Sequence, residues 1–164
     1  MQNFECVARF ICDGAIYLGS AAREDADFYK KLINALYFVD DPEKAYPISI
    51  SETIERSRPL FEKLGIPLSL EIIRFKDVPL GDLEGFAQSK LDHGAYIGLG
   101  YRPNDIFRTT GNNKHISQII STSRKGITIS DRELESPRTL DWELAEAITN
   151  EIDGGFWILQ RKSK

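Results

Sequence analysis

The chain has 164 residues, of which 41% are apolar and 28% charged, with a net charge of −4 and an isoelectric point near 5.3. These values are typical of a soluble globular domain, and the acidity excludes a broad nucleic-acid-binding surface. The sequence has no apolar run long enough to cross a membrane, and residues 1–5 lack the residue order of a signal peptide. We therefore expect a cytoplasmic protein that contacts neither nucleic acid nor a membrane.

The first segment predicts an N-terminal β-hairpin over residues 4–19. From Phe4 to Cys12 every second residue is Phe, Cys or Ala, and a period of two is typical of a strand. Asp13-Gly14 follows, a favoured pair for a two-residue turn because both positions need a positive φ. Residues 15–19 are then the returning strand.

A helix is predicted over residues 21–39, with Ser20 as its cap. Phe28, Leu32 and Leu36 recur every four residues, which is the spacing of a buried helical stripe. The acidic residues near its start suit the positive end of the helix dipole.

A second helix is predicted to begin at Ser49. Glu52 stands three residues further on, the arrangement of a capping box. Pro59 is expected to kink this helix or to split it in two, because proline removes a helical hydrogen bond. Gly65 suits the position just beyond its end.

The remaining elements alternate without the regular order of a parallel sheet. Strands are predicted at residues 70–75, 95–101, 116–122, 127–130 and 156–161, and helices at 79–91 and 140–152. Thr139 is the predicted cap of the last helix. We expect one α+β domain over residues 1–164, with a mostly antiparallel sheet, an N-terminal hairpin and about four helices.

An acidic segment covers the last predicted helix and the loop before it. Between Asp131 and Asp153 the sequence has eight acidic and two basic residues, a net charge of 2 − 8 = −6. At helical spacing, Glu143, Glu146 and Asp153 form one polar stripe beside Trp142. No lysine in the segment offsets these charges.

This segment carries the leading functional hypothesis, a non-enzymatic binding protein. An acidic face steers encounter with a basic protein, as small inhibitors and bacterial immunity proteins do when they neutralise a toxin such as a nuclease. The predicted partner-binding residues are Asp141, Trp142, Glu143, Glu146 and Asp153.

The alternative is a papain-like cysteine hydrolase or acyltransferase that uses Cys6 and His93. Such chemistry needs a thiolate, a histidine base and a polar group that orients the ring, and Asp105 is the candidate for the third role. The predicted mid-strand position of Cys6 argues against it, because reactive thiols of this kind start a helix. A small-molecule-binding α+β domain is a third possibility.

No metal or cofactor is expected. Cys6 and Cys12 are too few for a disulfide framework or a zinc site. The two histidines, His93 and His115, stand 22 residues apart without paired cysteines (115 − 93 = 22). His115 is interpreted as an exposed loop residue.

Overall fold

The computed structural model describes residues 5–20, 26–107 and 114–162. The chain divides into two compact units. The first, here called the helical unit, is Met1–Glu71 with Leu159–Lys164, and the second, here called the sheet unit, is Ile72–Ile158. The expectation of a single domain over the whole chain stays a prediction.

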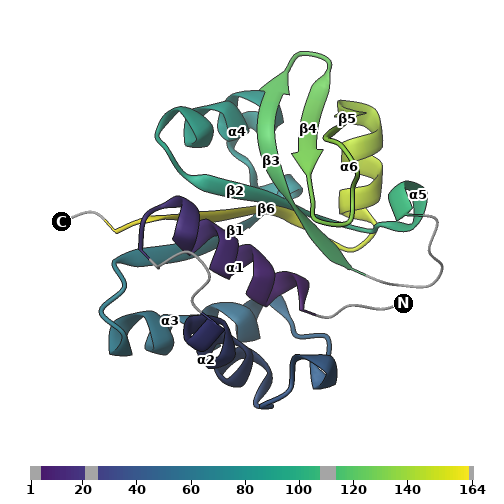
Figure 1. Ribbon diagram of the computed structural model, residues 1–164. Helices are drawn as coiled ribbons and strands as arrows, with labels where there is room; N and C mark the ends of the chain where they lie inside the picture. Colours follow the sequence, from purple (N-terminus) through teal and green to yellow (C-terminus); the bar gives the residue numbers. More distant parts are fainter. Residues whose placement is uncertain (1–4, 21–25, 108–113, 163–164) are drawn as a thin grey trace. The chain divides into compact units, whose positions relative to one another are not determined.

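The helical unit contains α1 (Cys6–Tyr17), α2 (Ala26–Tyr37), the 3-10 turn η1 (Pro42–Lys44) and α3 (Ile50–Lys63) (Figure 1). α2 packs against both α1 and α3. Phe28, Leu32 and Leu36 are buried, so the predicted inward stripe of α2 is confirmed. Residues 21–25, the predicted start of this helix, lie outside the described residues.

The predicted N-terminal hairpin is wrong, because residues 6–17 form helix α1. A strand would leave Val7 and Ile11 on the outer face with the polar residues. The helix buries them to 8% and 0% exposure, and burying such a side chain stabilises by about 1.5–3 kcal/mol. Asp13-Gly14 lies inside the helix, which ends at Tyr17, and the glycine with a positive φ of +73° is Gly19, just beyond that end.

The predicted boundaries of the second helix are confirmed in α3. The Ser49 hydroxyl accepts a hydrogen bond from the Glu52 amide at 3.1 Å. Gly65 has a φ of +65°, and the amide of Ile66 donates to the Phe61 carbonyl at 2.9 Å, which is a Schellman end. The helix is continuous through Pro59, so of the two predicted effects the split does not occur, and the kink stays a prediction.

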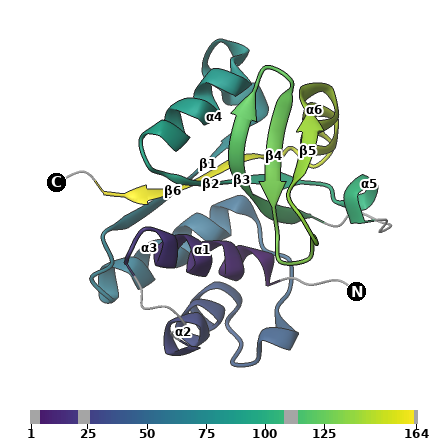
Figure 2. The same ribbon diagram turned by 45° about the horizontal axis from the view of Figure 1, so that its top comes forward.

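Six strands form one sheet in the order β1-β6-β2-β3-β4-β5. They are β1 (Leu68–Arg74), β2 (Tyr96–Tyr101), β3 (His115–Ser123), β4 (Gly126–Ser130), β5 (Arg138–Asp141) and β6 (Gly155–Arg161). β2, β3, β4 and β5 pair successively in antiparallel fashion and lie side by side in Figures 1 and 2. The α+β class with a mostly antiparallel sheet is confirmed.

The sheet unit adds helices α4 (Leu83–Asp92), α5 (Asn104–Phe107) and α6 (Trp142–Asn150), with 3-10 turns η2 (Phe75–Asp77) and η3 (Pro79–Gly81). The described residues therefore hold six α-helices rather than about four. α4 and α6 pack into the same apolar cluster as the strands. Its central members are Leu83, Ala87, Ile97, Leu99, Ile119, Ile127, Ile129, Ala145 and Ile148. No helix within the described ranges is both long enough and apolar enough to span a bilayer.

The last helix begins later than predicted, and its cap is Asp141 rather than Thr139. The Asp141 carboxylate accepts from the Leu144 amide at 2.8 Å. Thr139 and Leu140 belong to β5, where Leu140 is buried opposite Ile127. Leu140, which helical periodicity assigned to the last helix, and its predicted cap Thr139 therefore pair with β4 instead.

Gly126 allows β4 and β5 to approach closely. A Cβ at this position would collide with the carbonyl oxygen of Leu140 and lie 2.7 Å from its carbonyl carbon. We expect Gly126→Ala to lower the free energy of unfolding by about 1–3 kcal/mol, because backbone atoms cannot move aside. Urea denaturation measures this, with Ser121→Ala, an exposed site in the same hairpin, as the control. Equal stability of the two variants would contradict the close packing.

Candidate functional site

The acidic residues at the end of α6 are neutralised by cations that the sequence segment does not contain. The Asp153 carboxylate lies 2.9 Å from the Arg74 guanidinium and 3.4 Å from the Lys76 amine. The Glu151 carboxylate lies 2.5 Å from Arg102. The expectation that no lysine offsets the stripe is wrong at this end, because the chain after β1 brings Lys76 to Asp153.

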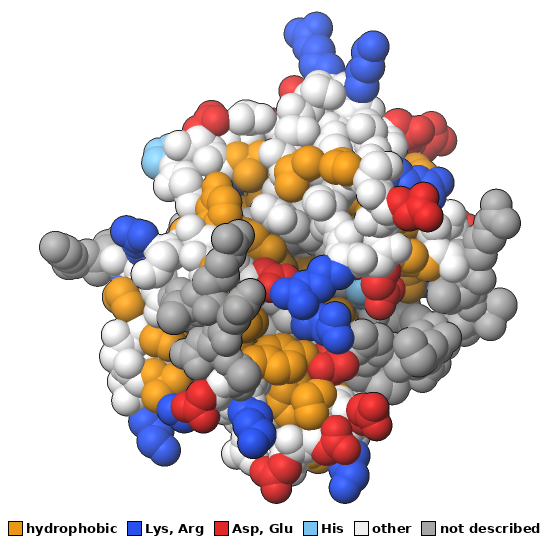
Figure 3. Space-filling view, viewed as in Figure 1, with side chains coloured by type: hydrophobic (Ala, Val, Ile, Leu, Met, Phe, Trp, Pro, Cys, Tyr) orange, Lys and Arg blue, Asp and Glu red, His pale blue; other side chains and the backbone are white. Residues whose placement is uncertain are grey.

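The start of α6 keeps its exposed charges. Asp141, Glu143 and Glu146 are exposed, and Asp141 is engaged as the helix cap. Trp142 is partly buried against the core, and its indole N–H donates to the Ser123 carbonyl at 2.8 Å. On the face drawn in Figure 3, basic and acidic side chains are interspersed rather than gathered by sign.

Cys6, His93 and Asp105, the predicted catalytic residues, occupy different elements. Cys6 is the first residue of α1 in the helical unit and is partly exposed. His93 follows the end of α4, where its Nδ1 lies 2.7 Å from the Ser89 carbonyl, and Asp105 is exposed on α5. Among the residues that the structure describes, His93 and Asp105 share no hydrogen bond or ion pair.

A different polar cluster lies in the sheet unit. The Nε2 of His115 lies 2.6 Å from Oδ2 of Asp131, and the Ser117 hydroxyl donates to the same oxygen at 2.9 Å. The Tyr101 hydroxyl lies 2.8 Å from Ser117 Oγ. The prediction that His115 is an exposed loop residue is wrong: it opens β3, and its side chain is only 13% exposed.

The strand register places these side chains on one face. Tyr101 of β2 is paired directly with His115 of β3. In the β3–β4 hairpin the register shifts between Ile119 and Ser121, which leaves one extra residue in β3. Gln118 pairs with Ser130, and the next pair in this register sets Asp131 opposite Ser117. If the register of the pairs near the turn, such as Ser123 with Gly126, continued without the shift, Asp131 would lie opposite Gln118. The side chain of Gln118 points to the other face.

The hydroxyl protons have a fixed direction in this cluster. A serine hydroxyl has one proton, and Ser117 gives it to Asp131, so the Tyr101 hydroxyl is the donor to Ser117. Tyr101 and Ser117 are 0% and 1% exposed. Two buried hydroxyl groups thus form a chain that ends at the carboxylate.

Asp131 is held as a carboxylate. Burial raises its pKa, but the hydrogen bond and charge of His115 act in the opposite direction, as do the Glu133 amide and the Ser117 hydroxyl. The net pKa of Asp131 lies below the ordinary 3.8. Hydrogen bonds to the charged form outweigh desolvation here.

Aromatic rings set the position of the His115 imidazole. It packs edge-on against Tyr101 at a centroid distance of 5.9 Å and against Phe107 at 5.3 Å. With the Nε2–H donated to Asp131, a neutral imidazole carries its lone pair on Nδ1. The arrangement is that of a histidine base oriented by a carboxylate.

The same residues are one possible set of metal ligands. Atoms of His115, Asp131 and Glu133 lie within 4.8 Å of one another. However, the Asp131 oxygens already accept from His115, Ser117 and the Glu133 amide. The carboxylate is therefore committed to hydrogen bonds, and the arrangement favours acid–base chemistry.

The sequence analysis did not predict the contact between His115 and Asp131, although it predicted the strands next to both residues. The strands at 116–122 and 127–130 were both predicted, and pairing them as a hairpin brings residues 115 and 131 together. What the periodicity does not reveal is the extra residue in β3, which decides the face on which Asp131 stands.

Comparison with known proteins adds no assignment. The sequence matches none of the protein-family models with which it was compared, and it shows no significant similarity to a curated protein. The function is therefore argued from the geometry of the described residues alone.

The low pKa of Asp131 makes a prediction about acid stability. A carboxyl group with a depressed folded pKa stabilises the fold above its unfolded pKa, and this contribution is lost as the pH falls through the folded pKa. We expect Asp131→Asn to lower the free energy of unfolding by about 1.5–3 kcal/mol near pH 6. The difference from the parent protein should vanish near pH 2.

Urea denaturation at several pH values measures this difference. Asp105→Asn, an exposed carboxyl group of the same unit, is the control and should change stability little. A deficit of Asp131→Asn that stays constant down to the lowest pH would show that the carboxylate charge does not stabilise the fold.

Proposed function

We propose that this protein is a hydrolase whose sheet unit activates water, with His115 as the general base and Asp131 as the group that orients it. The observation that carries the proposal is the 2.6 Å contact between His115 Nε2 and a carboxylate that Ser117 and a backbone amide also hold. His115 replaces His93 in the scheme that the sequence suggested.

The predicted mid-strand position of Cys6 is corrected in the helical unit. Cys6 is the first residue of a twelve-residue helix, so the objection based on a strand no longer holds. Its role as a nucleophile stays a prediction.

The proposed reaction is hydrolysis. His115 takes a proton from water, and the resulting hydroxide adds to the carbonyl carbon of an ester or thioester. The imidazolium then gives its proton to the leaving group, which departs as the carbonyl reforms on a carboxylic acid.

The proposal requires that His115 acts as a base, and hydrolysis of p-nitrophenyl acetate tests this without a known substrate. His115→Ala should lower the hydrolysis rate at neutral pH by at least about a hundredfold, because a positioned general base contributes about 10²–10⁴ in rate. Asp131→Asn, which removes the carboxylate that orients the imidazole, should lower it by at least about tenfold.

Two controls are available within the chain. His93→Ala and Cys6→Ala should each leave the hydrolysis rate unchanged. A rate indifferent to His115→Ala would overturn the proposal. A rate lowered by His93→Ala and Cys6→Ala instead would return the chemistry to the residues that the sequence suggested.

Docking of a basic protein remains a second proposed function, in narrower form. It is favoured by Glu143 and Glu146, which are exposed and have no ion pair among the described residues. Glu151 and Asp153 are already paired with cations. The proposed surface is therefore the first turns of α6 rather than the whole acidic segment.

Charge reversal distinguishes the two ends of this helix. A basic partner recovered at low salt should bind the double variant Glu143→Lys, Glu146→Lys at least about tenfold more weakly, because like charges across an interface cost several kcal/mol. Asp153→Lys is the control and should change affinity less. If both variants bind like the parent protein in calorimetry, α6 is not the docking surface.

A further inference from the structure

The helical unit carries a groove that neither proposed function uses. It lies between α2 and α3 and has a volume of about 780 Å³. Each helix gives it one continuous face. Lys30, Lys31, Asn34 and Ala35 stand at i, i+1, i+4 and i+5 on α2, and Arg56, Pro59, Leu60, Lys63 and Leu64 stand at i, i+3, i+4, i+7 and i+8 on α3.

The groove is lined by both apolar and basic side chains. Four cations, Lys30, Lys31, Arg56 and Lys63, line it with a single carboxylate, Asp40. Lys31 is paired with Asp27 at 3.0 Å and Arg56 with Glu52 at 3.3 Å. Lys30 and Lys63 are exposed and form no ion pair among the described residues, so they are available to a ligand carboxylate.

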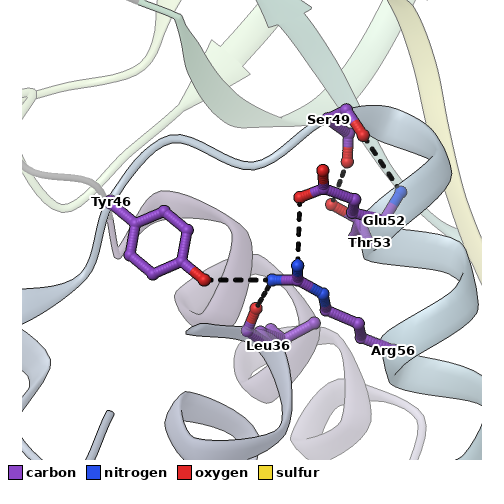
Figure 4. A network of polar contacts seen from close by, with 6 residues as sticks. All are labelled: Leu36, Tyr46, Ser49, Glu52, Thr53 and Arg56. Carbon is purple, nitrogen blue, oxygen red and sulfur yellow. Dashed lines mark hydrogen bonds and ion pairs between the residues drawn. The ribbon is translucent and has the colours of Figure 1, made fainter. Parts of the chain in front are cut away.

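Arg56 is fixed before any ligand binds (Figure 4). Its Nη1 donates to the Leu36 carbonyl at 2.7 Å and lies 3.3 Å from the Tyr46 hydroxyl. With Glu52 on the other nitrogen, the guanidinium is held from three elements. An immobilised arginine loses little further entropy when it binds a partner.

The guanidinium also covers an exposed aromatic ring. The Arg56 carbon Cζ lies 4.1 Å from the centroid of Phe38, whose side chain is 67% exposed. Phe38 has a φ of +57°, in the left-handed region that costs a non-glycine residue energy. Tyr46, 38% exposed, lies beside the same guanidinium. Exposed aromatics around an arginine are typical of protein interfaces.

We propose that the α2–α3 groove binds an acidic amphipathic helix of a partner protein. A groove between two helices, with Ala35, Leu60 and Leu64 in its lining, receives the apolar side chains of a third helix at i, i+4 and i+7. Lys30 and Lys63 match acidic residues that flank such a stripe, and Phe38 adds an exposed apolar surface against Arg56. The proposal is independent of the hydrolytic chemistry.

A designed peptide is the probe. It has fifteen residues, three leucines at helical spacing and glutamate at the flanking positions, and its matched counterpart has lysine in place of glutamate. Isothermal calorimetry with the full-length protein should give a micromolar Kd for the acidic peptide that weakens as salt is added. The basic peptide should not bind.

Variants locate the binding. Lys30→Glu with Lys63→Glu should weaken the acidic peptide at least about tenfold, because repulsion replaces two attractions. Arg58→Glu with Lys44→Glu changes the net charge equally, removes exposed cations that do not line the groove, and should leave the Kd within about twofold. Circular dichroism checks that both double variants fold.

Four outcomes would overturn the proposal. The first is equal binding of the two peptides, and the second is equal weakening by the two double variants. The third is failure of the acidic peptide while sodium dodecanoate binds, which would assign the groove to small amphipathic anions. The fourth is self-association of the parent protein that Lys30→Glu with Lys63→Glu abolishes, which would assign the groove to a second copy of the chain.

Discussion

Asp131 is a carboxylate with a side chain only 10% exposed, and a buried charge is tolerated only when hydrogen bonds replace its water. The sheet unit supplies three donors, from His115, Ser117 and the Glu133 amide. They converge because β3 has one extra residue between Ile119 and Ser121, before the turn that joins it to β4. Without that residue the carboxylate would point away from Ser117 and His115. The orientation of the imidazole, and with it any acid–base chemistry of this site, depends on that local irregularity.

The N-terminal segment shows how burial overrides sequence periodicity. An alternation of apolar residues around Cys6 fits a strand, yet the chain forms a helix because a helix buries Val7 and Ile11 together with Ala8 and Phe10. This change moves Cys6 from the middle of an element to its first position. The correction to the fold therefore removes the objection that the sequence raised against Cys6 as a nucleophile.

Charge on this protein is organised in space rather than along the chain. The acidic segment from Asp131 to Asp153 is the strongest compositional feature of the sequence, but Arg74, Lys76 and Arg102 neutralise its far end. In the helical unit the opposite occurs. Lys30 and Lys31 are far from Arg56 and Lys63 in the sequence, yet α2 and α3 place these four cations around one groove. Packing of α2 against α3 brings together residues that are far apart in the sequence.

The sequence by itself determined the elements whose signals are local. The Ser49 cap with Glu52, the end of α3 at Gly65, the stripe of α2 and the α+β class all follow from nearby residues, and each is confirmed. Only the tertiary structure decided the helical state of residues 6–17, the start of α6 at Trp142, and the meeting of His115 with Asp131. Each of these depends on burial or on strand register. Both are set by contacts between residues that are far apart in the sequence. A local pattern that fits both the helical and the strand period does not decide between helix and strand, because the outcome depends on what the segment packs against.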